Sequence, residues 1–446
     1  MNPVRPAPPA PPETIYAPAT APGRAAISII RMSGPQAGPA LAALVGGLPP
    51  PRVARHVRVC DPDSREPLDD ALVLWLPGPA SATGEDVAEL HLHGSRAVVV
   101  AIMSVLGRQG LRLAEPGEFT RRAFLNGKLD LVQAEAVADL TAAETEAQRR
   151  QALRQLNGSL GALYGDWSNR LLRLLAHLEA AIDFPDEDLP PETEQRAMAD
   201  TAALTEAIAA HLADGHRGER LRDGIVIAIL GPPNAGKSTL LNHLARRDVA
   251  ITSPIAGTTR DIIEVAVDLA GYPVVLADTA GLRDSCDAIE QEGLRRARAR
   301  AQSAQLRLFV FDAVRPEDAQ GATAWPGPDT LTVANKIDLL EDTAVVPAGA
   351  FGVSAVSGAG MPELLGVLAA RIAADYDGVA PLLTRARHRE ALETAAMALR
   401  RSLGQSLVEL RAEDLRLAWR SLGRITGRVD VEDLLDVIFA DFCLGK

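Results

Sequence analysis

A glycine-containing segment at Gly231–Thr239, GPPNAGKST, carries residue types that bind phosphate. It has the spacing G-x-x-x-x-G-K-[ST] and directly follows the apolar run GIVIAILG, which is typical of a buried strand. A glycine-bearing turn between a strand and a helix lets backbone N–H groups face a phosphate at the helix N-terminus. We expect Lys237 to reach the β- and γ-phosphates and Ser238 to offer its hydroxyl to Mg²⁺. The segment therefore predicts a nucleoside triphosphate site.

Three later segments indicate that the base is guanine. DTAG at Asp278–Gly281 ends an apolar run, which would place a carboxylate near Mg²⁺ and a glycine N–H near the γ-phosphate. NKID at Asn335–Asp338 ends another run, and the Asp338 carboxylate can accept two hydrogen bonds from guanine that adenine does not offer. SAV at Ser354–Val356 ends the last run, where it would back the base. With Thr259 of AGTTRD as a mobile Mg²⁺ ligand, these segments predict a GTPase domain.

The residue that follows DTAG is unusual for a GTPase. Ras-type enzymes place a glutamine there to orient the attacking water, but this chain has Leu282, which forms no hydrogen bond through its side chain. Another group must therefore position the water. The carboxylates in the next stretch are all candidates, although a solvated helix face is the commoner role for each; they are Asp284, Asp287, Glu290 and Glu292.

Metal-ligating residue types occur elsewhere, but not at ligand spacing. His91 and His93 would lie on the same face of a strand, and no third ligand is spaced to join them. The cysteines, Cys60, Cys286 and Cys443, are far apart and form no CxxC pair. This pattern argues against a structural zinc site or a disulfide framework and fits a reducing cytoplasm.

The chain ends in FCLGK, with Cys443 four residues from the end. A prenylation box would need aliphatic residues in its two middle positions, so Gly445 and then Lys446 depart from it. No polybasic stretch or second lipidation cysteine precedes it, and stable anchoring takes two signals. Two interpretations of Cys443 stay open: a reactive thiol, or a small residue packed at a helix end.

Composition limits the class of protein. The 446 residues are 47% hydrophobic and 23% charged, as in a water-soluble globular protein. The net charge of −12 excludes binding of nucleic acid by general phosphate neutralisation alone, so such a partner needs a local patch or a second protein. No apolar run is long enough to cross a membrane, and the start, MNPVRPAPPAPP, is not a signal peptide.

The sequence texture predicts a multidomain α/β and α protein. We expect a disordered lead at 1–12, an N-terminal α+β domain at 13–126, a first helical part at 127–221, a G domain at 222–376 and a second helical part at 377–446. In the G domain, strand-like runs alternate with helical segments, and IIEVAVDLAG with YPVVLADTAG predicts a hairpin. This alternation predicts a mostly parallel sheet with helices on both faces, inserted into the helical domain.

Several segments together resemble the MnmE (TrmE) family of tRNA modification GTPases. They are the asparagine of the phosphate loop, AGTTRD, DTAGLR, the terminal CLGK, and TAPGRAAISIIRMSG, TGEDVAELHLHG and PGEFTRRAFLNGKLDLVQAEAVADL in the first third. The resemblance runs from about Glu13 to Lys446. It implies an N-terminal tetrahydrofolate-binding-like domain, a discontinuous helical domain and an inserted G domain.

The resemblance also implies a function. Members work with the flavin-dependent protein MnmG (GidA), with which they form a heterotetramer, and add an aminomethyl or carboxymethylaminomethyl group to carbon 5 of the wobble uridine of certain tRNAs. The one-carbon unit comes from 5,10-methylene-tetrahydrofolate or a related folate. The members are cytoplasmic homodimers, not membrane proteins, whose G domains pair in a K⁺-dependent manner during GTP hydrolysis.

Residue by residue, the resemblance assigns K⁺ to Asn234, Ser253, Ile255 and Thr258, Mg²⁺ to Ser238 and Thr259, and the water-orienting role to Glu290. It assigns folate to Arg31, Glu89, Lys128 and Lys446, and a catalytic role to Cys443, whose thiol could add to carbon 6 of a uridine or assist proton transfer. From the residues alone, Arg31 and Lys128 are equally well explained as a surface strand residue and a turn residue. The expected GTP-binding residues are Asn234, Ala235, Gly236, Lys237, Ser238, Thr239, Ser253, Pro254, Ile255, Ala256, Gly257, Thr258, Thr259, Asp278, Thr279, Ala280, Gly281, Asn335, Lys336, Asp338, Ser354, Ala355 and Val356.

Two other classes of protein fit the sequence less well. Ribosome-assembly GTPases of the Era and Der type share the style of phosphate loop, but the chain has one G domain and no KH-like GXXG segment after it. A lipidated signalling switch would bind membranes, which the ending FCLGK does not support.

Overall fold

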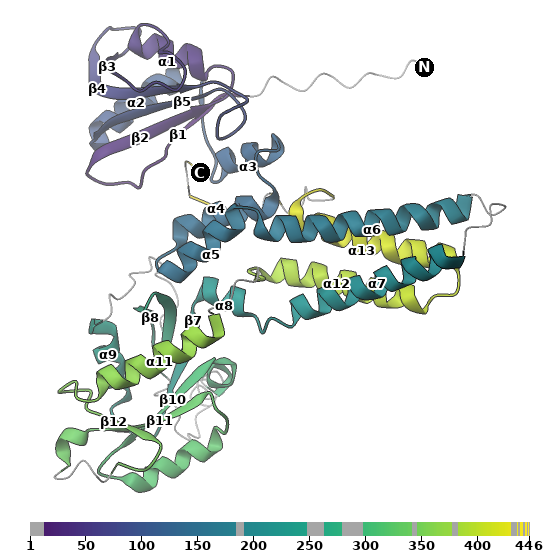
Figure 1. The fold of residues 1–446 in the computed structure, drawn as a ribbon. Coiled ribbons are helices and arrows are strands. Elements are labelled where there is room, and N and C mark those ends of the chain that lie inside the picture. Colours follow the sequence, from purple (N-terminus) through teal and green to yellow (C-terminus); the bar gives the residue numbers. More distant parts are fainter. Residues whose placement is uncertain are drawn as a thin grey trace, which may run out of the picture. The chain divides into compact units, whose positions relative to one another are not determined.

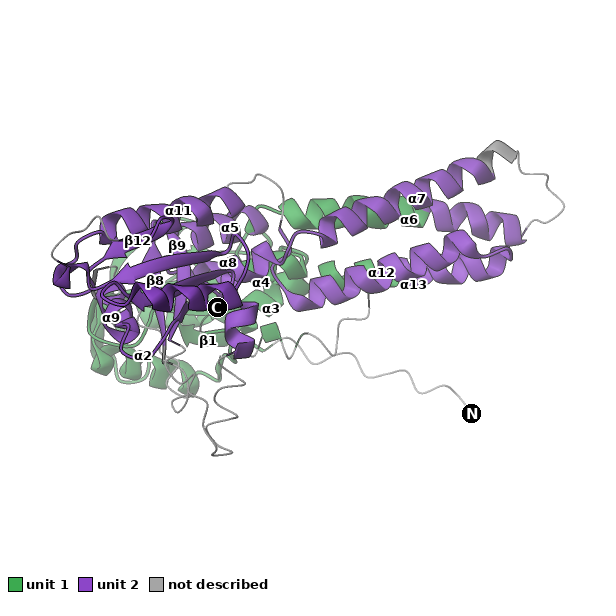
Figure 2. Ribbon diagram, turned by 90° about the horizontal axis from the view of Figure 1, so that it is seen from below, with its two compact units in different colours: residues 1–138, 156–172, 419–446 green, residues 139–155, 173–418 purple. Residues whose placement is uncertain are grey.

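The computed structural model describes residues 13–183, 191–247, 263–278, 298–340, 346–376 and 382–429, together with Leu435, Ile438, Phe439, Phe442, Cys443 and Gly445. The chain forms two compact units (Figure 2). Unit 1 comprises Met1–Ala138, Leu156–Leu172 and Trp419–Lys446, and unit 2 comprises Asp139–Gln155 and Arg173–Ala418. Among the described residues, no helix is long and apolar enough to cross a membrane.

Unit 1 begins with a six-stranded sheet in the order β3-β4-β5-β2-β1-β6 (Figure 1). Its strands are β1 (Ile15–Pro18), β2 (Ala25–Ser33), β3 (Arg55–Cys60), β4 (Pro67–Leu76), β5 (Val87–Gly94) and β6 (Arg112–Leu113). All pairs are antiparallel except β1 with β6. The expected α+β character of this region is confirmed.

The helices α1 (Ala37–Val45) and α2 (Arg96–Arg108) cover one face of this sheet. Side chains alternate along a strand, so Ile30 and Met32 of β2 point into the core beneath the helices, whereas Arg31 lies on the other face. At the start of α2, the Ser95 hydroxyl accepts the Val98 N–H at 3.2 Å, which satisfies a backbone donor that the helix itself leaves unpaired.

The rest of unit 1 joins α3 (Glu118–Leu125) and the start of α4 (Leu131–Ala142) to residues from the end of the chain. Phe439 and Phe442 are buried with Leu131 and Ala134, and their ring centroids lie 5.2 Å apart. Burial of two aromatic rings anchors the C-terminal residues on this unit.

Unit 2 contains helices that lie outside the G domain. They are α5 (Glu146–Leu156), α6 (Ser159–Asp183), α7 (Pro191–Leu212), α8 (Arg217–Asp223), α12 (Ala386–Gly404) and α13 (Val408–Thr426); the C-terminal end of α5, the start of α6 and the end of α13 belong to unit 1. Helix α7 packs along α12, whose buried residues recur at helical spacing, as in Leu392, Ala395, Ala396 and Leu399. The predicted helical texture is confirmed.

The G domain in unit 2 is built on a second six-stranded sheet, in the order β12-β11-β10-β7-β9-β8. The strands are β7 (Ile225–Leu230), β8 (Ile263–Leu269), β9 (Tyr272–Asp278), β10 (Leu306–Asp312), β11 (Thr330–Asn335) and β12 (Ala350–Val353). Only β8 pairs antiparallel, with β9, so both the predicted hairpin and the mostly parallel sheet are confirmed.

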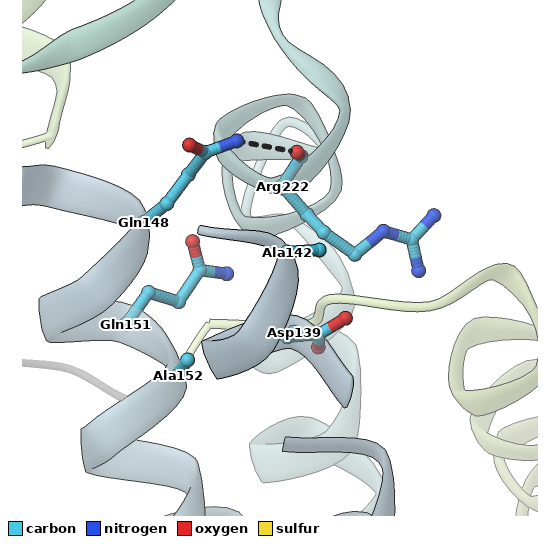
Figure 3. A pocket seen from close by; sticks show the side chains of 6 residues that line it. All are labelled: Asp139, Ala142, Gln148, Gln151, Ala152 and Arg222. Carbon is cyan, nitrogen blue, oxygen red and sulfur yellow. Dashed lines mark hydrogen bonds between the residues drawn. The ribbon is translucent and has the colours of Figure 1, made fainter. Parts of the chain in front are cut away.

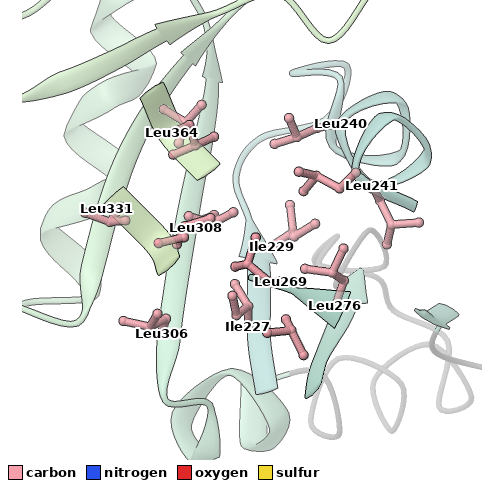
Figure 4. Close-up of a cluster of buried hydrophobic side chains, with 14 of the residues drawn as sticks. Ile227, Ile229, Leu240, Leu241, Leu269, Leu276, Leu306, Leu308, Leu331 and Leu364 are labelled. Carbon is pink, nitrogen blue, oxygen red and sulfur yellow. The ribbon is translucent and has the colours of Figure 1, made fainter. Parts of the chain in front are cut away.

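Apolar side chains fill both faces of this sheet. On one face, Ile227 and Ile229 of β7 pack with residues of α9 (Lys237–Arg247) and α11 (Met361–Tyr376), among them Leu240 and Leu364 (Figure 4). On the other face, Ala228 and Leu230 pack with Phe309, Phe311 and their neighbours. Burial of β7 on both faces explains its continuous apolar sequence and fixes the position of the loop that follows it.

Three glutamines of α5 bind the segments through which the chain enters and leaves the G domain. The amide nitrogens of Gln148 and Gln151 donate to the carbonyls of Arg222 and Gly218, each at 2.9 Å, and that of Gln155 donates to the Thr384 hydroxyl at 2.6 Å. Beside them is a cavity of about 40 Å³ lined by Asp139, Ala142, Gln148, Gln151, Ala152 and Arg222 (Figure 3). Their spacing at 148, 151 and 155 places the three amides on one helix face.

Candidate nucleotide site and flanking residues

The phosphate loop connects the end of β7 to the start of α9. Gly231 and Gly236 have φ values of 136° and 89°, in the left-handed region that favours glycine. A Cβ on Gly231 would lie 1.8 Å from the Val310 carbonyl oxygen, and one on Gly236 would lie 2.2 Å from Nδ2 of Asn335. Gly231 therefore allows the backbone of β10 to approach, and Gly236 allows the Asn335 side chain to approach, in addition to their part in the turn. Asn234 also has a positive φ, of 63°.

Lys237 is the first residue of α9 and is only 7% exposed. Its ammonium group donates to the carbonyl oxygens of Gly231 and Pro232, each at 2.9 Å. Burial lowers the pKa of Lys237, and the nearby Asp278 carboxylate partly opposes that shift. A cation held by two neutral carbonyls inside the loop is a favourable partner for phosphate oxygens.

Ser238 and Asp278 meet beside this lysine. The Ser238 hydroxyl donates to Oδ2 of Asp278 at 2.8 Å. Asp278 is the last residue of β9 and is 5% exposed, and its Oδ1 is buried with no hydrogen-bond partner among the described residues. A buried carboxylate oxygen without a partner is costly, and a hydroxyl beside it completes an oxygen donor set of the kind that Mg²⁺ prefers. The residues present therefore fit a magnesium ion.

Asn335 joins the phosphate loop to the loop after β12. Its Nδ2 donates to the Ala235 carbonyl at 2.8 Å, and its Oδ1 accepts the Ala355 N–H at 3.0 Å. It is 1% exposed, so these bonds are shielded from water. Next to it, the Lys336 ammonium lies 2.7 Å from Oδ2 of Asp312, and the Asp338 side chain is exposed at the same edge of the sheet.

Much of the expected site lies outside the described residues. This holds for Ser253, Pro254, Ile255, Ala256, Gly257, Thr258, Thr259, Thr279, Ala280, Gly281, Leu282, Asp284, Asp287, Glu290, Glu292 and Lys446. The described part brings together Lys237 and Ser238 with Asp278, and Asn335 with Ala355.

Three of the four expected folate residues are described, and all three lie in unit 1. Arg31 and Glu89 face each other on β2 and β5, with a nitrogen of the guanidinium 2.8 Å from Oε1 of the carboxylate. Burial alone would raise the pKa of Glu89, but Arg31 and His91 outweigh it and hold the pKa below its ordinary value. Lys128 is exposed and donates to the Pro79 carbonyl at 3.1 Å.

Cys443 lies exposed near the end of β1. Its carbonyl accepts the Gly117 N–H at 3.5 Å, and Gly445, two residues later, has a φ of 90°. A Cβ on Gly445 would lie 2.1 Å from the Pro18 carbonyl oxygen. Pro18 pairs with Ile30, next to Arg31, so the C-terminal residues lie beside the strands that carry the Arg31–Glu89 pair.

His91 and His93 each contact a carboxylate. His91 contacts Glu89 at 3.2 Å, and His93 contacts Asp69 at 2.7 Å, with the Asp69 carboxylate raising the pKa of His93. In the part of the chain that the structure describes, no group of three metal-ligating side chains occurs.

Sequence reasoning missed Asp312 as the partner of Lys336. The only signal was an acidic residue at the end of the apolar run LRLFVFD, which becomes β10. Because β10 and β11 are parallel and register Asp312 with Asn335, the carboxyl ends of both strands meet at the nucleotide edge.

The central strand of this mostly parallel sheet leads through a glycine-bearing turn into a helix. A buried lysine and an Asn–Lys–x–Asp segment lie at the same edge of the sheet. These features define a P-loop GTPase. Comparison with known proteins identifies the family within this class. The family model of the MnmE helical domain matches residues 131–443, and that of the GTP-binding protein TrmE N-terminus matches residues 14–128.

Full-length relatives agree with these matches. The chain is 56% identical to a tRNA modification GTPase MnmE of Rhodospirillum rubrum, over 97% of this chain and 99% of that one. It is 56% identical to another from Parvibaculum lavamentivorans, over 97% and 100% of the two chains. The G domain of the T. maritima FeoB iron transporter is 22% identical with a TM-score of 0.26, a likeness too weak to support a conclusion. The chain belongs to the MnmE family.

Proposed function

We propose that this protein hydrolyses GTP in the modification of tRNA, as the names of its relatives state for them. The observation that carries the proposal is the bridge made by Asn335, which binds the Ala235 carbonyl of the phosphate loop and the Ala355 N–H of the base-side loop. A single buried side chain thus couples the two halves of a guanine nucleotide site.

On the phosphate side, Lys237 would exchange its two carbonyl partners for β- and γ-phosphate oxygens. Ser238 would hold Mg²⁺, with Thr259 as a second ligand and Asp278 supporting the ion. The bound Mg²⁺ would neutralise charge that develops on the phosphates. The remaining expected GTP-binding residues would surround this core, and Asp338 and the Ser354–Val356 loop would contact the base.

We further infer that K⁺ assists hydrolysis. Asn234 lies on the phosphate loop, where its side chain is exposed and its backbone is in the left-handed region. With oxygens from Ser253, Ile255 and Thr258 it would place a monovalent cation near the β/γ-phosphates, where positive charge stabilises the transition state. Glu290 would orient the attacking water, because Leu282 lacks a hydrogen-bonding side chain.

For the one-carbon step, we propose that Arg31 and Glu89 bind a folate, with Lys128 and Lys446 contributing positive charge toward its glutamate tail. Glu89 stays ionised because of Arg31, so it can accept hydrogen bonds from a pterin ring. The thiol of Cys443, which lies beside the strands that carry Arg31 and Glu89, would add to carbon 6 of the uridine or assist proton transfer. The chain would work in the cytoplasm as a homodimer with MnmG, in a heterotetramer.

Communication between hydrolysis and modification would pass through α5. The Ala147 N–H donates to the Gly271 carbonyl at 2.9 Å, at the turn of the β8–β9 hairpin whose other end is Asp278. The glutamines of α5 bind the connections on either side of the G domain. Replacing Gln148 and Gln155 together by leucine should leave GTP hydrolysis intact and lower tRNA modification.

Purified protein tests the nucleotide part of this proposal. GTP hydrolysis should be faster in K⁺ than in Na⁺ and should be lost in Lys237→Ala. Equal rates in the two salts would remove Asn234 from the cation site, and Glu290→Ala should lower turnover with GTP affinity nearly unchanged. Parallel loss of turnover and affinity in Glu290→Ala would mean a structural role for that residue.

A further inference from the structure

His243 lies on α9, the helix that begins with the phosphate-binding residues Lys237 and Ser238. It is six positions after Lys237, about 9 Å along the helix axis at the usual rise. Its Nδ1 lies 3.0 Å from the carbonyl oxygen of Ala355, in the loop after β12. One short helix therefore contacts the phosphate loop at its start and the base-side loop further along.

The chemistry of the pair fixes the direction of this hydrogen bond. A carbonyl oxygen only accepts, so Nδ1 of His243 carries the proton and donates. In the neutral ring, Nε2 is then the atom with the lone pair, and it is buried with no partner among the described residues. The hydrogen bond to Ala355 is thus the contact that orients the imidazole ring.

Ala355 is held on both sides of its α-carbon. Its N–H donates to Oδ1 of Asn335 at 3.0 Å, and its C=O accepts from His243. The second of these bonds fixes the peptide that leads to Val356, whose side chain is 79% exposed at the tip of the loop. Without His243, only the first of the two peptides would be fixed by a side chain in this part of the structure.

The glycine at position 358 leaves space for the imidazole ring of His243. Gly358 has a φ of 81°, and a Cβ there would lie 3.3 Å from Cε1 of His243. The loop closes on itself through Ser354, whose carbonyl accepts the Gly358 N–H and whose N–H donates to the Ala359 carbonyl, each at 2.8 Å. The imidazole therefore packs against a compact turn and does not reach into open solvent.

We propose that His243 is a positioning residue for guanine recognition, which holds the peptide between Ala355 and Val356 in the orientation that receives the base. The inference rests on the proposed function, because it assigns a role within the same guanine site. His243 does not touch the reacting phosphates, so it sets nucleotide affinity and leaves the chemical step unchanged.

Two substitutions separate the hydrogen bond from simple packing. His243→Asn keeps an N–H donor at the position of Nδ1, whereas His243→Leu keeps apolar bulk and loses the donor. One hydrogen bond between neutral groups corresponds to a change of about five- to tenfold in affinity. We expect His243→Leu to weaken GDP binding by this factor and to raise KM for GTP with kcat unchanged, and His243→Asn to bind GDP nearly as well as the wild-type protein.

The measurements are GDP titrations and steady-state GTP hydrolysis with the full-length chain, after thermal unfolding without nucleotide has established that each variant folds. Unchanged GDP affinity in a folded His243→Leu would overturn the inference. Equal impairment of both variants would also overturn it, because the ring would then act by packing. If His243→Asn does not fold, His243→Gln, with a donor on a longer side chain, takes its place; if His243→Leu does not fold, His243→Met, which also lacks a donor, takes its place. Failure of the wild-type protein to bind GDP would refute the proposed function itself, which is a different result.

Discussion

The hydroxyl of Ser238 lies 2.8 Å from Oδ2 of Asp278, and the other oxygen of that carboxylate is buried without a partner among the described residues. The first residue comes from the start of α9 and the second from the end of β9, so two elements of the G domain converge on one point. Their meeting defines where a magnesium ion would be held.

Replacing Asp278 by asparagine should weaken Mg²⁺ binding. The amide keeps the size of the side chain but loses the negative charge that favours a divalent cation. We expect the Mg²⁺ concentration needed for half-maximal GTP hydrolysis to rise about 10- to 100-fold, the range typical for loss of a group that supports a metal site. Magnesium titrations of the wild-type protein and the variant measure this; superimposable curves would exclude Asp278 from the site.

Lys237 should destabilise the protein when no nucleotide is bound. Burial lowers its pKa from the ordinary value of 10.5, so the folded state binds fewer protons than the unfolded state between the two values. Stability therefore rises with pH in that window, and the cost of the buried charge is present in full below the folded pKa. Lys237→Met should raise the unfolding temperature of the nucleotide-free protein and abolish the further rise on adding GDP. A lower unfolding temperature without nucleotide would contradict this account.

The pair formed by Arg31 and Glu89 should also make stability rise with pH, but in a window at acidic pH. Burial raises and Arg31 lowers the pKa of Glu89, with a net value below the ordinary 4.5. A carboxyl of this kind stabilises the folded state above its unfolded pKa and loses that effect as the pH falls through the folded value. Glu89→Gln should cost about 1 kcal/mol at pH 7. The difference from the wild-type protein should shrink as the pH falls below about 4.5 and disappear below the folded pKa of Glu89, as measured by urea unfolding at a series of pH values.

The C-terminal residues depend on Gly445. A side chain there would meet the Pro18 carbonyl oxygen, since the added Cβ would lie 2.1 Å away, and the φ of 90° disfavours any other residue. Gly445→Ala should therefore displace Cys443 and reduce tRNA modification, by about 100-fold if the reacting groups move by about 1 Å. GTP hydrolysis by the isolated protein should not change.

A matched control for this variant is Gly366→Ala in α11, where an added Cβ has no atom within 4 Å. It should leave modification intact and increase stability slightly, because alanine favours helix. Full modification in Gly445→Ala would show that the position of the chain end is unimportant. Cys443→Ser then separates thiol chemistry from packing, since serine preserves the size of the side chain and loses the sulfur.

The sequence predicted the local parts of the site well. The phosphate loop could be recognised because its strand, turn and helix are contiguous, and the β8–β9 hairpin because two strand-like runs flank a short turn. Contacts between residues far apart along the chain could not be predicted. Asn335 reaches Ala235 across 100 positions and His243 reaches Ala355 across 112, and each contact depends on how sheet and helix pack. No periodicity or spacing encodes such pairs.

The same limit applied to the charged residues of the first third. From the residues alone, Arg31 could equally be an ordinary surface residue, and only the antiparallel register of β2 with β5 brings it opposite Glu89, 58 positions away. The glutamines of α5 gave no signal either, because exposed and bridging glutamines have the same sequence pattern.

We propose that GTP hydrolysis by this chain is required for modification of the wobble uridine of tRNA. This proposal is tested most directly by digesting tRNA from cells whose only copy of the gene carries Lys237→Ala and measuring the modified wobble uridine by mass spectrometry. The account predicts that the modified nucleoside is lost and returns when the wild-type gene is supplied. A normal level of the modified nucleoside in the Lys237→Ala cells would contradict it.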